Sequence, residues 1–113
     1  MKIYEEFDKR RNEGNERVFA QNDLVYKRFF NLDTNAFIPG ALDEKTKQLI
    51  GLSCSLMLRC NDCTIYHIRE SVNCGATRQE INEAMNISLI IGGSIVVPHL
   101  RYALEALDEL ISS

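Results

Sequence analysis

Apolar residues recur at helical spacing along most of the chain. They are sparse in residues 2–21, denser in residues 23–37 and 44–59, and they recur in residues 63–74 and 96–112. Apolar positions that repeat every three or four residues form one face of a helix. The alternation of a half-buried strand is seen nowhere in the sequence. The pattern therefore predicts an all-α fold, a multi-helical bundle whose short loops join antiparallel neighbours.

Turn and capping residues mark the predicted boundaries between these helices. A Pro-Gly pair at residues 39–40 predicts a turn, and Asp43 is a good N-cap for the helix that follows. Gly75 has the position of the residue just beyond a helix C-terminus. Thr77 and Glu80 have the spacing of a capping box, in which each side chain bonds the other residue's backbone N–H. We therefore expect a new helix to begin directly after Thr77.

Residues 86–97 are apolar on nearly every side of a helix. Such a helix is buried all round. Because a chain of this length has little material to cover it, we interpret the segment as a subunit interface and expect a homo-oligomer. The alternative is the central helix of a monomeric bundle. Pro98 is compatible only with the first turn of the last helix.

Length and charge narrow the class of protein. The 113 residues predict a single domain over residues 1–113. The net charge of −3 is small and mixed in sign, so neither nucleic acid nor an anionic membrane is expected as a partner. The charged N-terminal segment lacks the apolar core of a signal peptide. No apolar run approaches the ~18 residues that span a bilayer. These features predict a cytoplasmic protein.

Four cysteines in a reducing compartment point to free thiols, redox chemistry or metal binding more than to structural disulfides. Cys60, Cys63 and His67 fall within roughly 60° of one another on a helical projection. The aliphatic residues of the same helix point elsewhere, namely Ile65, Ile68 and Val72. The cysteine pair lies at the predicted helix start, where free backbone N–H groups favour a thiolate. His67 lies one turn after Cys63, within reach of its proton.

Two other interpretations of this motif remain open. The spacing Cys-x2-Cys-x3-His offers three zinc ligands, and a structural site needs a fourth, which Cys74, Cys54 or His99 could supply. Alternatively, the cysteines are small core residues and His67 is a hydrogen-bonded polar group. We expect Cys54 and Cys74 to be ordinary core cysteines and His99 to be a structural histidine.

Residues 42–94 resemble the carboxymuconolactone decarboxylase family in its AhpD-like (alkylhydroperoxidase-like) branch. The matching elements are the opening LDEKTK, the CxxCxxxH motif, the GATRQEI that follows and a late GGS. The resemblance implies an all-helical fold and a homo-oligomer, with a hexamer favoured over a trimer. It also implies a dithiol site that acts on a hydroperoxide or a disulfide and is recharged by a reductant protein or small thiol. No metal or other cofactor is expected.

By this resemblance, Cys63 would be the histidine-activated thiol, Cys60 its disulfide partner and His67 the base. The decarboxylase branch typically lacks the cysteine pair, so the motif argues against lactone decarboxylation here. The expected activity is that of a thiol-disulfide oxidoreductase with alkylhydroperoxidase activity of the peroxiredoxin type. The alternatives are a non-catalytic oligomeric redox sensor or scaffold, and a zinc-binding module.

The sequence departs from the family at one site position. The family's proton relay usually begins with a glutamate in KxKEL, whereas this chain has KTKQL, which places Gln48 there. Glutamine can orient His67 by a hydrogen bond, but it can neither stabilise an imidazolium by charge nor take a proton. Weak peroxidase activity would follow, unless another carboxylate supplies the charge. The candidates in the sequence are Glu44, Asp62 and Glu70.

Overall fold

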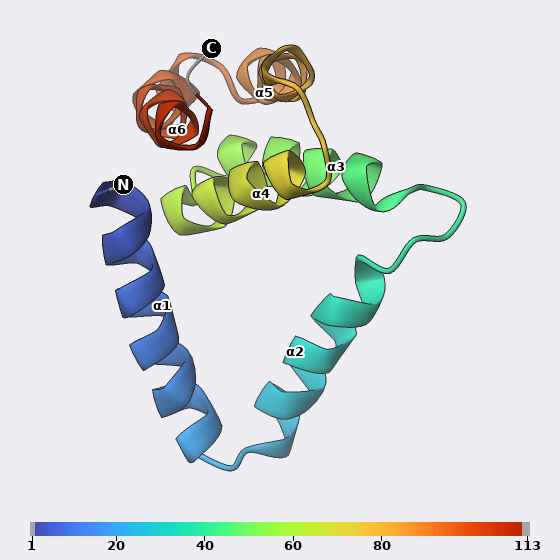
Figure 1. Ribbon diagram of the computed structural model, residues 1–113, viewed down its shortest axis with the longest axis vertical. Coiled ribbons are helices and arrows are strands. Elements are labelled where there is room, and N and C mark those ends of the chain that lie inside the picture. Colours follow the sequence, from blue (N-terminus) through green and yellow to red (C-terminus); the bar gives the residue numbers. More distant parts are fainter. Residues whose placement is uncertain (1, 112–113) are drawn as a thin grey trace.

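The computed structural model describes residues 2–111 and confirms the all-α fold (Figure 1). This part of the chain contains α-helices, one short 3₁₀ helix and no strand. The elements are α1 (Lys2–Ala20), α2 (Leu24–Ala36), α3 (Glu44–Met57), α4 (Asn61–Asn73), α5 (Arg78–Gly92), the 3₁₀ helix η1 (Ser94–Val96) and α6 (Val97–Leu110).

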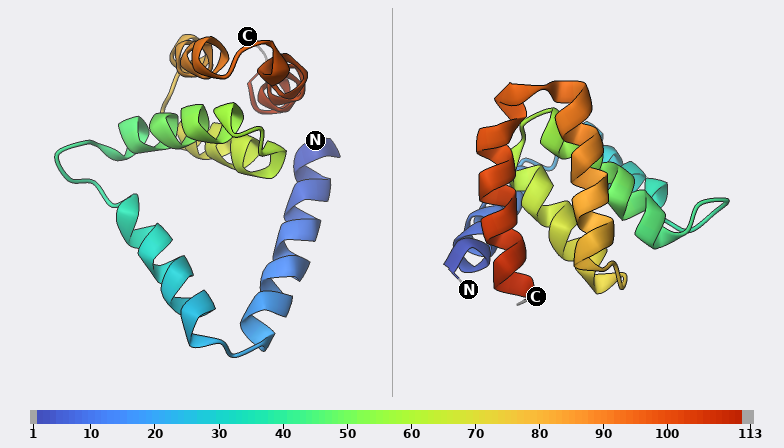
Figure 2. Two further views of the ribbon diagram at one scale, coloured as in Figure 1. Left: turned by 180° about the vertical axis from the view of Figure 1, so that it is seen from behind. Right: turned by 90° about the horizontal axis from the view of Figure 1, so that it is seen from above.

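The helices are arranged around a central pair, α3 and α4. Helices α5 and α6 lie side by side across one face of this pair, where α5 packs on α3 and α6 packs on α4 (Figure 2). On the other face, α1 and α2 extend away from the central pair as two arms and meet at their far ends (Figure 1). The arms and the central pair form a triangle, so α1 and α2 face the α3–α4 pair across an opening.

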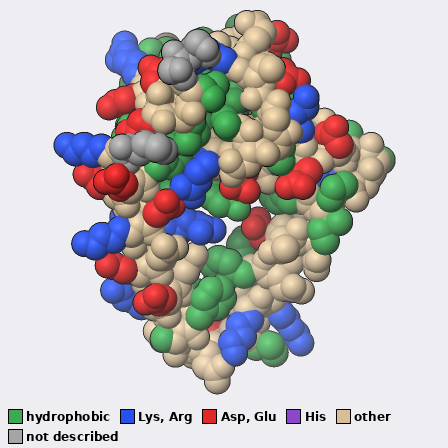
Figure 3. Space-filling view, viewed as in Figure 1, with side chains coloured by type: hydrophobic (Ala, Val, Ile, Leu, Met, Phe, Trp, Pro, Cys, Tyr) green, Lys and Arg blue, Asp and Glu red, His purple; other side chains and the backbone are tan. Residues whose placement is uncertain are grey.

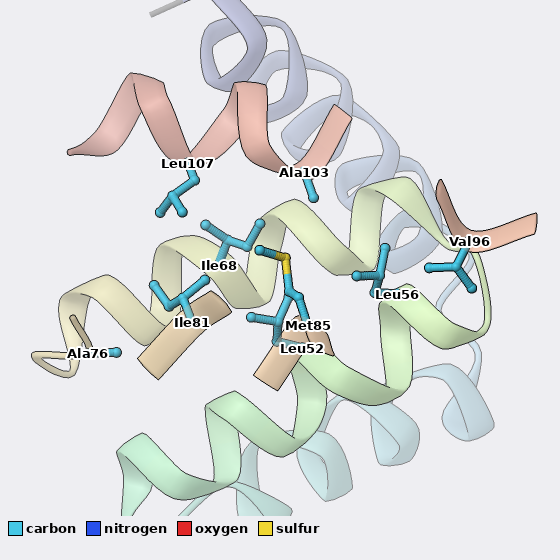
Figure 4. Packing of buried hydrophobic residues seen from close by; sticks show 9 residues of the cluster. All are labelled: Leu52, Leu56, Ile68, Ala76, Ile81, Met85, Val96, Ala103 and Leu107. Carbon is cyan, nitrogen blue, oxygen red and sulfur yellow. The ribbon is translucent and has the colours of Figure 1, made fainter. Parts of the chain in front are cut away.

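The hydrophobic core lies between the central pair and the α5–α6 layer (Figure 4). Each of these four helices contributes fully or almost fully buried side chains to it. The core residues are Leu52, Leu56, Ile68, Ala76, Ile81, Met85, Val96, Ala103 and Leu107. Since this cluster does not include α1 or α2, the main core is built by the four C-terminal helices.

The α1 arm is anchored at its N-terminal end. Tyr4 and Phe7 are buried, and the Tyr4 hydroxyl donates a hydrogen bond to the Ile65 carbonyl at 2.7 Å. The carboxylate of Glu109, on α6, accepts hydrogen bonds from the backbone N–H groups of Ile3 and Tyr4 at 2.9 and 3.3 Å. A negative charge at a helix N-terminus satisfies its free donors and complements its dipole. The first two turns of α1 are therefore fixed to α4 and α6.

The α2 arm is held mainly at its ends. Asp23 caps its start by accepting from two backbone N–H groups. At its C-terminal end, Lys47 Nζ donates to the carbonyls of Ala36 and Ile38 at 2.9 and 2.7 Å, which ties α2 to α3. Helix α2 has no buried residue, although it is rich in apolar ones. Those that are exposed in this chain are Leu24, Val25, Tyr26, Phe29 and Leu32.

Several predicted boundaries are confirmed. Thr77 and Glu80 form the capping box, and Gly75 follows α4 with a φ of +88°. Asp43 accepts from the Thr46 N–H as the N-cap of α3. Around the cysteine motif the prediction was two residues off at each side, because α3 ends at Met57 and α4 already begins at Asn61. No helix in residues 2–111 is both long and apolar enough to cross a membrane.

The prediction of one continuous helix over residues 86–97 was wrong. Helix α5 ends at Gly92, and Gly93 has a φ of +82°, a conformation that glycine adopts without strain. The short η1 helix then leads into α6, with Pro98 in its first turn. The segment is also only partly buried within the chain, since Ser88 and Val96 are buried but several apolar residues are not. Its exposed apolar residues are Ile87, Ile90, Ile91 and Ile95.

Candidate functional site

The cysteine pair forms the start of α4. Arg59 has a φ of +62°, which turns the chain between α3 and α4 and leaves Cys60 as the N-cap of α4. The Cys60 sulfur accepts a hydrogen bond from the Cys63 N–H at 3.3 Å. The two Cα atoms are 5.4 Å apart and the sulfurs lie within disulfide-bonding distance. This Cα separation is ordinary for a disulfide.

Cys63 and His67 open onto the same cavity, between the arms and the central pair. The cavity has a volume of about 520 Å³, and residues of α1, α2 and α4 line it. Figure 3 shows this face of the molecule hollowed between the arms, with hydrophobic side chains inside the opening. Phe7, Val18 and Phe30 provide apolar walls. The cavity therefore gives a small organic molecule access to the exposed Cys63.

Three side chains fix the imidazole of His67. Its Nδ1 lies 2.8 Å from Oε1 of Gln48, whose side chain is buried. Phe37 stacks on the ring with centroids 5.3 Å apart, and Tyr66 contacts it edge-on at 5.1 Å. Because an amide oxygen only accepts hydrogen bonds, Nδ1 carries the proton. The neutral ring therefore keeps its acceptor lone pair on Nε2, the form that can take a proton from a thiol.

Gly51 of α3 leaves the space that the imidazole occupies. A Cβ atom at this position would lie 2.9, 3.0 and 3.1 Å from Cε1, Nδ1 and Nε2 of His67. Nearly equal distances to three adjacent ring atoms place that carbon over the face of the ring. Real Cβ contacts are longer, so any side chain here would displace the imidazole from Gln48. The hydrogen bond between His67 and Gln48 thus requires the close approach of α3 and α4 at Gly51.

The electrostatic environment favours a neutral His67. Burial lowers the pKa of His67 below the usual histidine range, because a charged ring is poorly solvated there. The carboxylate of Asp33, on α2, acts in the opposite direction. At neutral pH the ring is therefore mostly unprotonated and able to accept a proton. Gln48, a neutral side chain, adds no charge that would stabilise the resulting imidazolium.

Comparison with known proteins settles the family. The sequence model that describes the carboxymuconolactone decarboxylase family matches residues 23–109, which include Cys60, Cys63 and His67. The chain belongs to the carboxymuconolactone decarboxylase family. A relative from Paracoccus denitrificans, known as uncharacterized protein 4 in cox locus, is 33% identical over 82 residues, which are 73% of this chain and 74% of the relative.

Solved structures of family members share the fold. A protein from Thermotoga maritima has 51% sequence identity and a TM-score of 0.91, over 95% of this chain and 94% of that one. That Thermotoga maritima protein is described as having a suggested involvement in antioxidative response. The apo form of a Legionella pneumophila family protein has 30% identity and a TM-score of 0.69, over 96% of this chain and 89% of that one. These matches confirm the resemblance and are consistent with the AhpD-like branch.

The remaining candidate residues lie apart from this family motif. Cys54 is exposed on α3, and Cys74 is half-buried at the C-terminal end of α4, so the expectation of two core cysteines was wrong. Burial and a hydrogen bond to Glu44 raise the pKa of the Cys74 thiol. His99 Nδ1 lies 2.9 Å from Oδ1 of Asn61. In residues 2–111, no three or more His, Cys, Asp or Glu side chains are grouped as a metal site.

The structure adds residues to the site that the family motif does not contain. Phe37, the C-cap of α2, stacks on His67, Gly51 of α3 lies against the ring, and Asp33 of α2 lines the same cavity. No local spacing in the sequence relates them to the CxxCxxxH motif. A weak signal is the spacing of Asp33 and Phe37, which lie one helical turn apart at the end of α2 and therefore share a face.

Proposed function

We propose that this family member is a thiol-disulfide oxidoreductase that reduces organic hydroperoxides through Cys63, Cys60 and His67. The observation that carries the proposal is the joint geometry of these three residues. Two sulfurs lie at disulfide-bonding distance at a helix start, and a neutral imidazole opens onto the same cavity as the exposed sulfur. The antioxidative role suggested for the Thermotoga maritima protein supports the same chemistry.

In the oxidising half of the cycle, Cys63 gives its thiol proton to Nε2 of His67. The resulting thiolate attacks the terminal oxygen of the hydroperoxide, and the O–O bond breaks. Cys63 becomes a sulfenic acid, while the alkoxide takes the proton from His67 and leaves as an alcohol. The Cys60 thiol then attacks the Cys63 sulfur. Water leaves and the Cys60–Cys63 disulfide forms.

In the reducing half, a reductant protein with two thiols, or two small thiol molecules, restores the pair by exchange. The incoming thiolate attacks one sulfur of the disulfide, and a second thiol resolves the mixed disulfide. The reductant supplies two electrons and two protons in each cycle. A protein disulfide could enter by the same exchange in reverse, which is why both hydroperoxides and disulfides are candidate substrates.

A redox sensor with little turnover is the second candidate. It is favoured by Gln48, which bonds His67 where the family usually has a carboxylate. The buried neutral amide leaves the imidazolium less stabilised, so proton transfer from Cys63 is slower. The same disulfide would then form and signal oxidation without rapid recycling. Steady-state consumption of hydroperoxide in the presence of excess dithiol distinguishes the two candidates.

The direct test is a thiol titration of the reduced protein before and after one equivalent of an organic hydroperoxide. The four cysteines should give four reactive thiols at first, and then two. Peptide mapping without reductant should find the loss in a Cys60–Cys63 crosslink that dithiol reverses. Four unreactive or unlinked thiols, with stoichiometric zinc found by metal analysis, would contradict the redox function.

We also propose that the chain forms a homo-oligomer, a hexamer by its resemblance to small family members. The apolar residues exposed on α2 and near the end of α5 support this, because monomers rarely expose so many neighbouring large apolar side chains. Light scattering at micromolar concentration should give a multiple of the 12.9 kDa chain mass. A monomer under these conditions would overturn the assembly without affecting the thiol chemistry.

A further inference from the structure

Asp33 lies on the face of α2 that is turned toward the cysteine site. Phe30, three residues before it, lines the same cavity as Cys63. Phe37, four residues after it, stacks on His67. Residues at this spacing share one helix face, so Asp33 is placed between two aromatic contacts to the site. It lines the Cys63 cavity and also a smaller one of about 280 Å³ that Gln48 borders.

The position of Asp33 is fixed from the C-terminal end of α2. Lys47 binds the carbonyls of Ala36 and Ile38, and the stacked Phe37 ring closes the contact with His67. These interactions hold the C-terminal end of α2, whose last turn contains Asp33, against the site. The backbone at Asp33 is therefore held beside the site, while its side chain is exposed to solvent.

The other acidic groups around His67 already have partners. Asp62 pairs with Arg10 at 2.7 Å. Glu44, one turn before Gln48, lies near the Cys74 thiol and raises the pKa of that thiol. Glu70 accepts a hydrogen bond from Asn73.

The remaining basic groups are also engaged. Arg69 pairs with Asp8 at 2.9 Å, and the guanidinium of Arg11 lies over the Tyr66 ring at 5.0 Å. Across residues 2–111, the structure gives no ion pair or side-chain hydrogen bond to Asp33. Asp33 is therefore the charged side chain of the cavity whose carboxylate is free to act on the site.

We propose that Asp33 is a positioning residue for the thiol chemistry, whose carboxylate stabilises the imidazolium of His67 across the cavity in place of the missing glutamate. The contribution of Asp33 to the reaction of Cys63 rests on the proposed function. Gln48 sets the tautomer and orientation of the ring, while Asp33 supplies the charge. Two residues on different helices thus share the two tasks that a single carboxylate performs in the usual relay.

Two opposite effects of this charge decide the expected sign. A carboxylate favours the imidazolium but disfavours the Cys63 thiolate that forms with it. The Asp33 carboxylate lines the same cavity as the ring and acts on it through space, where it opposes the fall in the pKa of His67 that burial causes. Cys63 lies one turn farther along α4, toward its N-terminus, and the free N–H groups there offset a nearby negative charge. The effect on the imidazolium should therefore dominate.

The first test is an NMR titration of the two histidines in the disulfide form, because the linked cysteines do not titrate and cannot couple to the ring. Asp33→Asn should move the His67 titration midpoint to lower pH, and Asp33→Glu should restore it. His99, whose Nδ1 lies 2.9 Å from Oδ1 of Asn61 outside this cavity, serves as the internal reference in the same spectra. Glu13→Gln, an exposed site outside the cavity, controls for the change in net charge.

The second test is the rate of Cys63 alkylation in the reduced protein. Asp33→Asn should slow it roughly two- to five-fold at neutral pH and low salt, the range of a solvent-screened ion pair, and the difference should shrink as salt is added. In a Gln48→Glu background the same change should have less effect, since a nearer carboxylate then supplies the charge.

An unchanged His67 midpoint in Asp33→Asn would overturn the proposal, as would faster alkylation, which would show that the charge acts mainly against the thiolate. A shifted midpoint with slower alkylation in a protein that turns over no hydroperoxide would support Asp33 and contradict the proposed peroxidase function. The experiments can therefore contradict the role of Asp33 and the peroxidase function independently of each other.

Discussion

Replacing Cys63 by serine is expected to abolish hydroperoxide reduction, by on the order of 10³-fold or more. A serine hydroxyl is not ionised near neutral pH and is a far weaker nucleophile than a thiolate. Cys63 is the exposed sulfur of the pair and shares the cavity with His67. The measurement is consumption of an organic hydroperoxide with excess dithiol, compared with the parent protein.

Cys60→Ser should behave differently, because it removes the resolving sulfur and leaves the attacking one. The first reaction with hydroperoxide should persist, and the protein should then stall as a sulfenic acid that a sulfenate-trapping reagent captures. Cys54→Ser is the matched control, since it removes an exposed thiol that lies outside the motif. If Cys60→Ser lost the fast first step and Cys63→Ser retained it, the two roles would be reversed.

Gln48→Glu is expected to speed the reaction of Cys63, by up to the order of 10²-fold at neutral pH. The amide oxygen already lies 2.8 Å from Nδ1 of His67, so a carboxylate of the same shape needs no rearrangement. Its charge would stabilise the imidazolium and raise the pKa of His67, and the alkylation profile of Cys63 should extend to lower pH. A carboxylate buried at this position should lower the free energy of unfolding whenever His67 is neutral, because it then lacks a charged partner.

Two further variants make this test decisive. Gln48→Leu removes the hydrogen bond without adding charge and should slow the reaction, because Nδ1 then loses the acceptor that fixes the tautomer. His67→Ala removes the base and should change the profile most. If Gln48→Glu left the profile unmoved while His67→Ala changed it, histidine activation would stand and the missing carboxylate would not matter.

The sequence predicted the parts of the fold that depend on local chemistry. Asp43, Gly75 and the Thr77–Glu80 box each satisfy backbone groups within a few residues, so their roles follow from spacing alone. The break at Gly93 was missed because the apolar run around it satisfies a helical pattern whether or not the helix continues. Only the positive φ of Gly93 reveals the turn.

Which side of each helix faces the chain's own core could not be predicted in the same way. Cys54 was expected in the core because free cysteine usually packs as a small apolar residue, but the packing of α5 on α3 leaves it exposed. The surroundings of His67 were hidden for a related reason. Gly51 lies against the ring and Asp33 lines the cavity beside it, and only the packing of different helices relates these two residues to the motif.

The position of Cys60 at the first turn of α4 has a consequence for how easily the oxidised protein is recharged. When an incoming thiol attacks Cys63, Cys60 is the leaving group, and it departs as a thiolate beside the free N–H groups of the helix start. Stabilising that thiolate favours the reduced state and makes the disulfide a stronger oxidant. A helix-terminus interaction of about 0.3–1 kcal/mol corresponds to a rise of roughly 5–20 mV in the reduction potential of a two-electron couple. The turn that holds the two sulfurs together thus also eases their separation.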